Sequence, residues 1–286
     1  MNNSPLRYPG GKSKLFPLVD MLIEELNIVN GTYIEPFVGG GGLALSLLYN
    51  QKVSKIIIND YDCAIYSIWY AILNDTQKFI DLVKNAELNI EEWRRQKDIY
   101  NNRKNEYSIE LAFATFYLNR TNRSGILKAG PIGGYSQNGD YKIGARFNKD
   151  NLVNRILEIS KYKNRIELYN LEIRDFINMI NKKNIINGFI YFDPPYYNKG
   201  KELYTNFFDK DDHLEIYELI SNVTIPWMIT YDDVDEIRNI YINHNLKKFD
   251  INYSVANKGK NSEIIGLSSD FWPSKEKLGK LKINIR

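Results

Sequence analysis

The chain has 286 residues, 43% of them apolar and 26% charged, and carries a formal charge of +3. That length and apolar content suit a globular protein with a packed core and argue against a disordered chain. The weak net charge does not by itself indicate a nucleic-acid partner. The charge is uneven, however, because residues 91–165 hold 15 Lys and Arg against 8 Asp and Glu, which leaves 23 against 27 for the remainder. The positive charge is concentrated in the middle of the sequence.

Cysteine usage and hydropathy exclude further classes. The single cysteine, Cys63, cannot form an internal disulfide, and only His213 and His244 accompany it, so no zinc-binding spacing exists. We expect no metal site. No signal peptide opens the sequence, and the longest apolar stretches, such as residues 43–49, are too short to span a bilayer. We therefore expect a soluble, cytoplasmic and monomeric protein without a membrane partner.

The first part of the chain predicts a β-turn-α-β unit. Its expected elements are a helix over 15–26, a strand over 32–35, a glycine turn over 39–42, a helix over 43–49 and a buried strand over 55–59. Connections of this kind join parallel strands with right-handed geometry. The pattern is typical of an α/β domain.

The pattern changes in the middle of the chain and then returns. The later expected elements are a helical region over 65–120, loops over 121–147, a helix over 152–160 and strands over 166–168, 189–192 and 227–230. We predict an α/β, Rossmann-like, doubly wound mixed sheet in two parts, residues 1–64 and 156–286. A mostly helical, basic insertion over 65–155 interrupts it.

The glycine turn predicts a site for an adenosine moiety. In doubly wound folds such a turn follows the first strand, and an acid about 20 residues later ends the second strand. Gly39, Gly41 and Asp60 fit this scheme, with Asp60 accepting hydrogen bonds from ribose hydroxyls. The same glycines, followed by Ala44, also satisfy the nicotinamide-dinucleotide fingerprint, and glycine turns occur in folds without a cofactor.

A second glycine-containing segment, Arg7–Ser13, resembles a phosphate-binding loop only superficially. That loop requires glycine at position 6, where Leu6 stands, and a strand before it, which is absent from the pattern. Two interpretations stay open: a surface turn, or a turn that folds over an adenine with Tyr8 as its stacking face.

Asp193-Pro194-Pro195-Tyr196 is the strongest chemical signal. Asp193 follows a predicted central strand and should lie at the same sheet edge as the glycine turn. The two prolines end the strand because they cannot donate to a sheet ladder. The alternative is purely structural: the prolines end a strand and Tyr196 caps the core.

The groups that this tetrad offers suit methylation of a nucleobase amine. The lone pair of such an amine is delocalised into the ring, so acceptors must hold its hydrogens and aim the lone pair at a methyl group. The carboxylate of Asp193 and the carbonyl of Pro194 can do so. Stacking on Tyr196, about 1–3 kcal/mol in single-strand binders, would offset part of the few kcal/mol needed to extrude a base.

Taken in order, the motifs resemble those of the Dam-like family of DNA adenine methyltransferases, in the alpha motif order. Tyr8–Lys12 matches the family's N-terminal cofactor segment, Glu35–Gly41 its glycine motif and Asp193–Tyr196 its catalytic motif. The resemblance implies methyl transfer from S-adenosylmethionine to adenine N6 in double-stranded DNA, with base flipping. It also implies that the insertion is the target-recognition domain between two parts of a catalytic domain.

The resemblance also implies individual site residues. The catalytic residues are Asp193, Pro194, Pro195 and Tyr196. The cofactor-binding residues are Tyr8, Lys12, Glu35, Pro36, Phe37, Gly39, Gly41, Asp60, Asp175 and Asp193, of which Asp175 rests on a match of Asp175-Phe176 alone. The DNA-binding residues are Arg7, Arg120, Asn122, Arg123, Ser124, Lys128 and Arg146.

The recognition segment departs from the branch of the family that reads GATC. That branch has an aromatic-Asn-Gly step, where this chain has Asn122-Arg123-Ser124-Gly125, and Lys128 stands where a base-reading Arg is expected. We therefore do not expect GATC specificity. Arg123 can contact guanine or hold a phosphate. Arg146, Lys149 and Arg155 are either phosphate contacts or solvated charges.

Three other functions stay open from sequence alone. The same fold can methylate RNA adenine or a protein amide, although those enzymes more often carry Asn-Pro-Pro-Tyr. The dinucleotide fingerprint allows a nicotinamide-dependent oxidoreductase, and a DNA-binding module without catalysis is the third. A methyltransferase of this kind either partners a restriction endonuclease or acts alone.

Overall fold

The computed structural model describes residues 3–7, 11–197, 208–250, 262–268, 272–281 and 284–285. The first elements are η1 (Lys12–Leu15), α1 (Phe16–Glu25), β1 (Thr32–Glu35), α2 (Gly42–Tyr49) and β2 (Lys55–Asn59). The insertion holds α3 (Cys63–Asn74), α4 (Thr76–Asn85), α5 (Ile90–Asn101), α6 (Ile109–Thr121), η2 (Arg123–Gly125), η3 (Ile143–Arg146) and α7 (Lys149–Lys161). These elements agree with the predicted order of helices and strands.

The second half of the chain returns to the sheet. Its elements are η4 (Lys163–Arg165), β3 (Ile166–Tyr169), α8 (Ile173–Lys182), β4 (Gly188–Phe192), α10 (Lys210–Ser221), β5 (Trp227–Asp232), α11 (Asp235–Ile240), β6 (Lys247–Asp250), β7 (Ser262–Leu267), α12 (Lys275–Gly279) and β8 (Asn284–Ile285). The three strands expected in this half are present as β3, β4 and β5.

The described strands form an eight-stranded sheet in the order β3-β2-β1-β4-β5-β7-β6-β8. The five strands from β3 to β5 are parallel, and β7, β6 and β8 pair antiparallel. The predicted doubly wound mixed sheet is therefore confirmed. Its parallel strands are runs of apolar residues because helices cover both faces.

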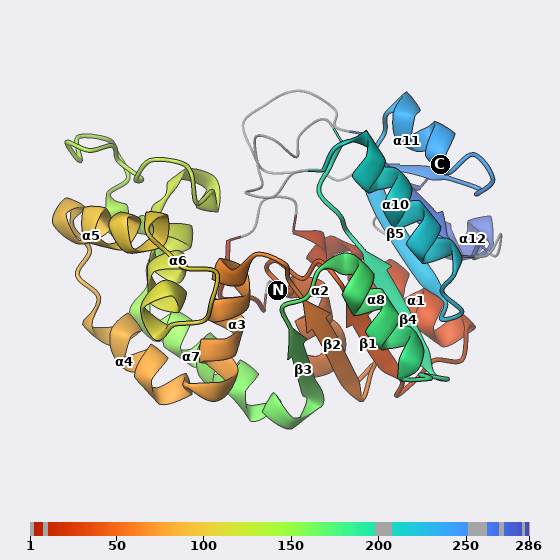
Figure 1. Ribbon diagram of the computed structural model, residues 1–286, viewed down its shortest axis with the longest axis horizontal. Helices are drawn as coiled ribbons and strands as arrows, with labels where there is room; N and C mark the ends of the chain where they lie inside the picture. Colours follow the sequence, from red (N-terminus) through yellow and green to blue (C-terminus); the bar gives the residue numbers. More distant parts are fainter. Residues whose placement is uncertain are drawn as a thin grey trace.

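Alternating side chains along the strands feed two separate cores. Tyr33, Ile56 and Ile58 point to one face, where they join the core formed with α1, α2 and α3. Their neighbours Ile34 and Ile57 point to the other face and pack with α8, α10 and α11. This alternation follows from the two-residue period of a strand. Figure 1 shows α8 and α10 together on one side of the sheet.

The strand order places a ligand crevice at the centre of the sheet. β1 pairs with β2 on one side and with β4 on the other, so the chain winds outward in both directions from β1. In open α/β sheets, ligands bind outside the carboxyl ends of the strands at this reversal. Glu35 ends β1, and Asp193 directly follows β4. The reversal therefore brings these two acids to one place.

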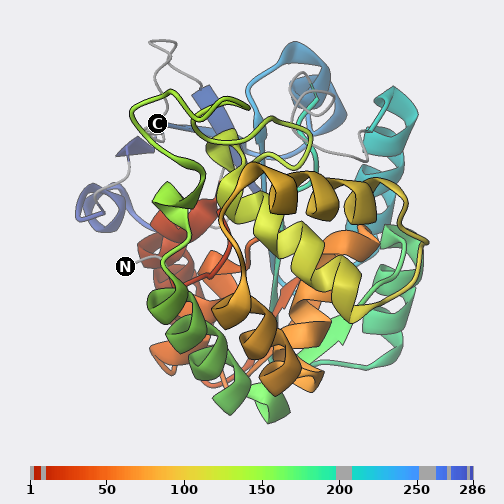
Figure 2. The ribbon, with the colours of Figure 1, turned by 90° about the vertical axis from the view of Figure 1, so that its left-hand side faces the viewer.

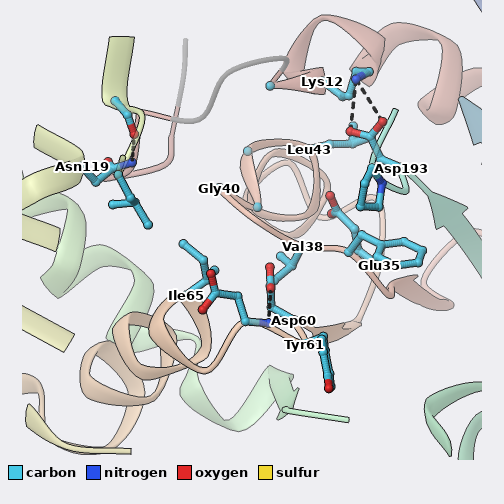
Figure 3. A pocket seen from close by; sticks show the side chains of 18 of the residues that line it. Lys12, Glu35, Val38, Gly40, Leu43, Asp60, Tyr61, Ile65, Asn119 and Asp193 are labelled. Carbon is cyan, nitrogen blue, oxygen red and sulfur yellow. Dashed lines mark hydrogen bonds and ion pairs between the residues drawn. The ribbon is translucent and has the colours of Figure 1, made fainter. Parts of the chain in front are cut away.

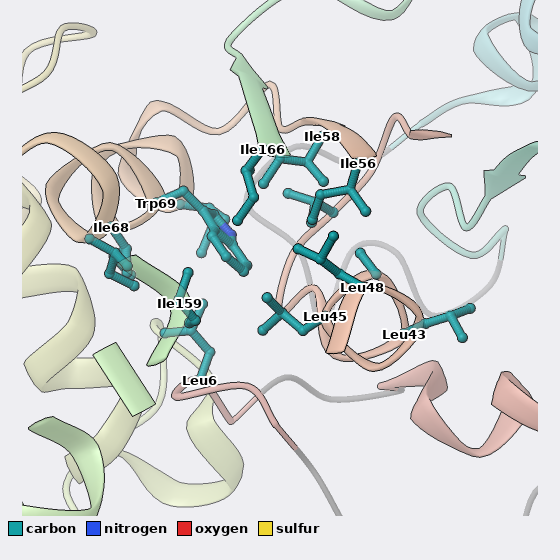
Figure 4. Close-up of a cluster of buried hydrophobic side chains, with 14 of the residues drawn as sticks. Leu6, Leu43, Leu45, Leu48, Ile56, Ile58, Ile68, Trp69, Ile159 and Ile166 are labelled. Atoms are coloured by element: carbon teal, nitrogen blue, oxygen red, sulfur yellow. The ribbon is translucent and has the colours of Figure 1, made fainter. Parts of the chain in front are cut away.

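The insertion helices share a core with the sheet. Figure 1 shows the helices from α3 to α7 on one side of the sheet, and Figure 2 shows the same helices facing the viewer. Figure 4 shows Trp69 of α3 among residues of β2 and α2, with Ile159 of α7 beside Leu6. The expected boundaries at residues 64 and 155 fall inside α3 and α7. The division into domains therefore stays a prediction.

Polar caps start the helices that carry the insertion. Asp62 accepts from the backbone N–H of Ala64 before α3, and Ser108 accepts from Leu111 before α6. Asn148 does the same for α7. Such caps satisfy backbone donors that the first helical turn leaves unpaired, and each stabilises by about 1 kcal/mol.

Candidate active site

A pocket opens at the carboxyl ends of β1, β2 and β4. Its volume, including the open mouth, is about 1210 Å³. Pockets that bind small molecules usually have roughly 300–1,000 Å³, so this pocket is large enough for a cofactor. Figure 3 shows Asn119 and Ile65 on one side, and Lys12, Asp193 and Glu35 on the other. The predicted site residues that line it are Lys12, Glu35, Phe37, Gly41, Asp60, Lys128, Asp193 and Pro195. The structure thus brings segments from five parts of the chain together.

The glycine turn after β1 is held by packing and by Asp60. Gly41 has a φ of 58°, and a Cβ there would lie 2.5 Å from Trp69 of α3. The indole N–H of Trp69 donates to the carbonyl of Gly39 at 3.0 Å, and the N–H of Gly39 donates to Asp60 Oδ2 at 2.9 Å. Gly41 is therefore required by Trp69, a reason that the glycine pattern does not contain.

Glu35 is a buried acid that faces the pocket. It is 5% exposed, and its Oε2 has no hydrogen-bond partner among the described residues. Burial raises the pKa of Glu35 well above its usual range, and the negative charge of Asp193 raises it further. A buried carboxylate oxygen without a partner is costly unless a ligand satisfies it.

Asp60, predicted to bind ribose hydroxyls, also holds the glycine turn through hydrogen bonds. Its Oδ1 accepts from the N–H of Asp62 at 3.0 Å, and its Oδ2 accepts from Gly39. Burial, followed by the charge of Asp62, raises the pKa of Asp60 to about 7. An ionised carboxylate has about four acceptor sites, so Asp60 keeps capacity for hydroxyl donors in the pocket.

Lys12 joins the N-terminal segment to the Asp-Pro-Pro-Tyr motif. Its ammonium lies 3.0 Å from Asp193 Oδ1 and 3.1 Å from Oδ2, and it donates to the hydroxyl of Tyr196 at 2.6 Å. A second acid, Glu263 of β7, lies 3.8 Å from the Lys12 ammonium. With Glu35 close by, the buried end of the pocket holds one ammonium group and several carboxylates.

Two residues that the sequence did not single out orient Asp193. The hydroxyl of Thr230, on β5, donates to Asp193 Oδ1 at 2.9 Å. The hydroxyl of Tyr191, on β4, lies 2.7 Å from the hydroxyl of Thr230, and both residues are fully buried. Because Thr230 donates to Asp193, Tyr191 must donate to Thr230. Hydrogen bonds from β5, supported by β4, thus hold Asp193 in place, while its side chain is 19% exposed.

Several predicted residues lie outside the pocket lining. Pro36 and Gly39 do not line the pocket. The carbonyl of Pro36 accepts from the side-chain amide of Asn59 at 3.0 Å, and that of Gly39 accepts from Trp69 at 3.0 Å. Asp175 is exposed in the first turn of α8 and lines neither cavity. Among the catalytic residues, Pro194 does not line the pocket and Tyr196 is 7% exposed beneath Lys12. Tyr8 lies outside the described residues.

A second cavity adjoins the first. The two share Phe37, Tyr61 and Phe208 as lining residues, and the second continues toward the loop after β3, where Leu171 and Ile173 lie. Sequence reasoning did not describe this extension, whose lining mixes apolar residues with Glu172, Asp212 and Glu215. The signal available was the Asp175-Phe176 match, which stands two residues beyond Ile173.

The predicted DNA-binding turn divides into exposed and buried residues. Arg123, Ser124 and Lys128 are exposed. Asn122 is fully buried: its Oδ1 accepts from the indole N–H of Trp93 at 2.7 Å, and its Nδ2 donates to two carbonyls of the same turn. The amide of Asn122 is fully used inside the protein. We therefore reassign Asn122 from a DNA contact to a residue that shapes the turn.

Asn119 clamps the N-terminal segment to this turn. Its Oδ1 accepts from the N–H of Arg7 at 2.8 Å, and its Nδ2 donates to the carbonyls of Arg7 at 2.8 Å and Gly125 at 3.1 Å. Gly125 has a φ of 78°, and a Cβ there would lie 2.3 Å from the carbonyl oxygen of Arg7. The segment before the cofactor motif and the recognition turn are thus one unit.

Comparison with known families decides between the open functions. The sequence model of the D12 class of N6 adenine-specific DNA methyltransferases matches residues 8–255, which is most of the chain. The chain belongs to this family. The enzyme is a DNA adenine-N6 methyltransferase, and both the pocket and the recognition turn lie within the matched residues. The predicted resemblance and activity are therefore confirmed.

Two curated relatives share most of their length with this methyltransferase. It is 28% identical to the type II methyltransferase M.MjaIII of Methanocaldococcus jannaschii over 265 residues, which are 85% of this chain and 89% of that protein. It is 23% identical to the type II methyltransferase M.CviBI of Paramecium bursaria Chlorella virus NC1A over 218 residues, 73% of this chain and 76% of that protein.

A solved structure, the rRNA methyltransferase aviRa of Streptomyces viridochromogenes, overlaps 89% of this chain and 85% of its own at 10% identity, with a TM-score of 0.31. That overlap is too loose to bear on function.

In the described part of the methyltransferase, every helix is too short or too polar to cross a membrane.

Proposed function

We propose that the enzyme binds S-adenosylmethionine in the pocket at the ends of β1, β2 and β4, and methylates an adenine that has left a DNA duplex. The observation that carries this proposal is the charge of the pocket lining. It contains four acidic side chains, Glu35, Asp60, Asp62 and Asp193, against two lysines, Lys12 and Lys128. The raised pKa values of Glu35 and Asp60 mean that these carboxyls are short of cationic partners, and a bound cation would favour their ionised forms. A negative lining favours a cationic ligand, and S-adenosylmethionine carries a sulfonium and an ammonium against one carboxylate.

The same charge balance disfavours a dinucleotide. A nicotinamide cofactor would place an anionic pyrophosphate beside the glycine turn, where Asp60 and Asp62 both line the pocket. Sites for pyrophosphate normally offer backbone N–H groups and few acids. Here the N–H of Gly39 is already bonded to Asp60. The glycine spacing alone therefore misleads about the ligand.

Individual residues fit the parts of S-adenosylmethionine. The unpartnered Oε2 of Glu35 suits its ammonium group, and the spare acceptor capacity of Asp60 suits its ribose hydroxyls. The cavity beyond Phe37 and Tyr61, lined by aromatic and aliphatic side chains together with carboxylates that can accept from an amine, suits its adenine ring. Asp175 is left out of this assignment because its side chain is exposed on α8.

Bound S-adenosylmethionine supplies a methyl group activated by the sulfonium. The chain itself contributes acceptors at the target amine. Asp193 is held by Thr230 and Lys12 and still has acceptor capacity, so it can take one N6 hydrogen. Held in this way, the amine would present its lone pair to the methyl carbon, the new N–C bond would form as the C–S bond breaks, and the surplus N6 proton would pass to Asp193 or to solvent. No covalent enzyme intermediate is needed, and positioning lowers the barrier.

The pocket is recessed, which is why the target base must leave the helix. Enzymes that modify a base inside a duplex extrude it at a cost of a few kcal/mol. Tyr196 was predicted to stack on the extruded base. At 7% exposure, its ring must first be uncovered, and Lys12 is the group that sits over it.

The proposed partner is double-stranded DNA, met in the cytoplasm by a monomeric enzyme. Both curated relatives are named type II methyltransferases, which supports a role beside a restriction endonuclease. Arg123 and Lys128 are the exposed candidates for reading bases. The turn differs from that of the GATC-reading branch, so the expected target is another sequence.

Calorimetry tests the cofactor assignment without requiring turnover. S-adenosylhomocysteine, the reaction product, should bind to the protein, and NADH should not. Labelled S-adenosylmethionine should then transfer its label to duplex DNA and not to RNA. Binding of NADH, or label on RNA alone, would overturn the proposed function.

A further inference from the structure

Four arginines from four separate segments gather around residues 4–7. Arg155 of α7 donates to the carbonyl of Ser4 at 2.6 Å. Arg120, at the end of α6, donates to the carbonyls of Pro5 at 3.4 Å and Arg146 at 2.7 Å. Arg7 donates to the carbonyl of Asn122 at 3.0 Å. We call Arg7, Arg120, Arg146 and Arg155 the arginine cluster.

The arginine cluster is positive without compensating acids. In the described part of the chain, none of its members lies within ion-pair distance of a carboxylate, although many other Lys and Arg residues do. Burial, followed by the positive charges of Arg7, Arg155 and Arg146, lowers the pKa of Arg120 to about 10. Burial and Arg146 lower the pKa of Arg7 as well. Like charges held this close destabilise the fold unless an anion binds.

The cluster also has donors to spare. A guanidinium carries five N–H donors in a planar fork that matches the oxygens of a phosphate. Arg7 and Arg155 each use one donor in the bonds above, and Arg120 uses two. The side chain of Arg146 is exposed. The bonds to backbone carbonyls fix the guanidinium groups in place and leave donors for a ligand.

The position of the cluster identifies the anion. Arg7 is bonded to Asn122, the residue that opens the exposed turn with Arg123. Five residues beyond Arg7, Lys12 contacts Asp193 in the pocket. Asn119, which lines the pocket, bonds both backbone groups of Arg7, so an anion bound at the cluster lies beside both the recognition turn and the pocket wall. A phosphodiester of the DNA strand meets this requirement better than a free anion.

We propose that the arginine cluster binds phosphates of the DNA backbone and so holds the strand in a fixed position beside the active-site pocket. This inference rests on the proposed action on duplex DNA and adds the site that holds the strand. It makes Arg155 a DNA-binding residue and decides between the two roles left open for Arg146. Phosphate contacts of this kind position the protein and carry no sequence information.

Salt dependence of DNA binding tests the cluster. Each lost phosphate contact should lower the slope of log affinity against log salt by about 0.9. Arg146→Gln and Arg155→Gln should each weaken binding several-fold, equally for DNA of any sequence, and lower the slope. Arg146→Lys should keep most of the slope because the charge remains. Arg174→Gln on α8, outside the cluster, is the matched control and should leave both values unchanged.

Two further measurements keep the test decisive. Melting temperature and affinity for S-adenosylhomocysteine show whether each variant is folded. Arg146→Gln is the cleanest variant because the Arg146 side chain makes no hydrogen bond to another described residue. Unchanged slope and affinity in Arg146→Gln and Arg155→Gln would overturn the inference. So would inorganic phosphate that stabilises the wild type, but not Arg146→Gln, while DNA binding is unaffected. Label transfer by the wild type separates these results from failure of the proposed function.

Discussion

The pocket and the arginine cluster carry opposite unbalanced charges a few residues apart along the chain. The pocket lining has more carboxylates than lysines, and the arginine cluster has no acid within ion-pair distance among the described residues. Both arrangements are unfavourable for the protein alone. The difference supports both proposals, because each region suits a ligand of opposite charge: a cationic methyl donor at the pocket and a polyanionic strand at the arginine cluster.

One short segment connects the two regions. Arg7 belongs to the cluster and Lys12 to the pocket, and Asn119 holds Arg7 against the recognition turn. Asn119 also lines the pocket. The proposed sites for the DNA strand and the methyl donor therefore share Asn119 as a common support. Such an arrangement suits an enzyme whose catalysis depends mainly on positioning.

The largest effect should come from Asp193→Ala on the acidic side. Removing the acceptor at the target amine should lower the transfer rate by about 10²- to 10³-fold, the range for one preorganised group at a reacting centre. Single-turnover transfer from labelled S-adenosylmethionine measures this. Melting temperature serves as the control. A folded variant with near wild-type rate would remove Asp193 from the chemistry.

Glu35→Gln should mainly weaken cofactor binding. A hydrogen bond to a charged group contributes about 1.5–3 kcal/mol, which corresponds to roughly 10- to 150-fold in affinity. Calorimetry with S-adenosylhomocysteine measures the change, and DNA affinity should stay near wild type. If DNA binding fell and cofactor binding did not, the charge comparison between the two regions would be wrong.

Thr230→Val should have a smaller effect, on rate alone. It removes the hydroxyl that donates to Asp193 Oδ1 while keeping the side-chain shape. We expect kcat to fall by about tenfold, near the energy of one hydrogen bond to a charged group, with KM for S-adenosylmethionine little changed. Thr230→Ser is the matched control and should recover the rate. Equal loss in both variants would indicate a packing role instead.

The pH dependence of cofactor binding should be the mildest effect. Because the pKa of Asp60 is raised to about 7, this carboxylate takes up a proton as pH falls through that value and accepts ribose hydroxyls less well. Affinity for S-adenosylhomocysteine should fall from pH 8 to pH 6 by at most about tenfold, the limit if only the ionised form binds. Asp60→Asn should flatten this part of the profile. A wild-type profile with no such fall would exclude Asp60 as the titrating group.

The fold was largely predictable because its strands are strongly patterned. The buried runs 55–59 and 189–192 and the glycine turn were identified from sequence, and the structure has them as β2, β4 and the loop after β1. The later elements β6, β7 and β8 were not predicted. Their pairing is antiparallel and depends on distant partners, such as Met228 with Leu267, which local patterns do not reveal.

The candidate site was predictable only where a motif carried the chemistry. Lys12, Glu35, Asp60 and Asp193 were named from sequence and line one pocket. The supporting residues were missed because their roles arise from strand pairing. Thr230 reaches Asp193 only because β5 pairs with β4. Buried Asn122 resembled a polar contact residue because sequence does not report burial.

The most direct test of the account is to identify the methylated base. Duplex DNA of varied sequence should be incubated with the enzyme and S-adenosylmethionine, digested and analysed by nucleoside mass spectrometry, with Asp193→Ala alongside. We expect N6-methyladenine with the wild type and about 100-fold less or lower with the variant over the same incubation time. Methylated cytosine in place of methyladenine, or equal product from both proteins, would contradict it.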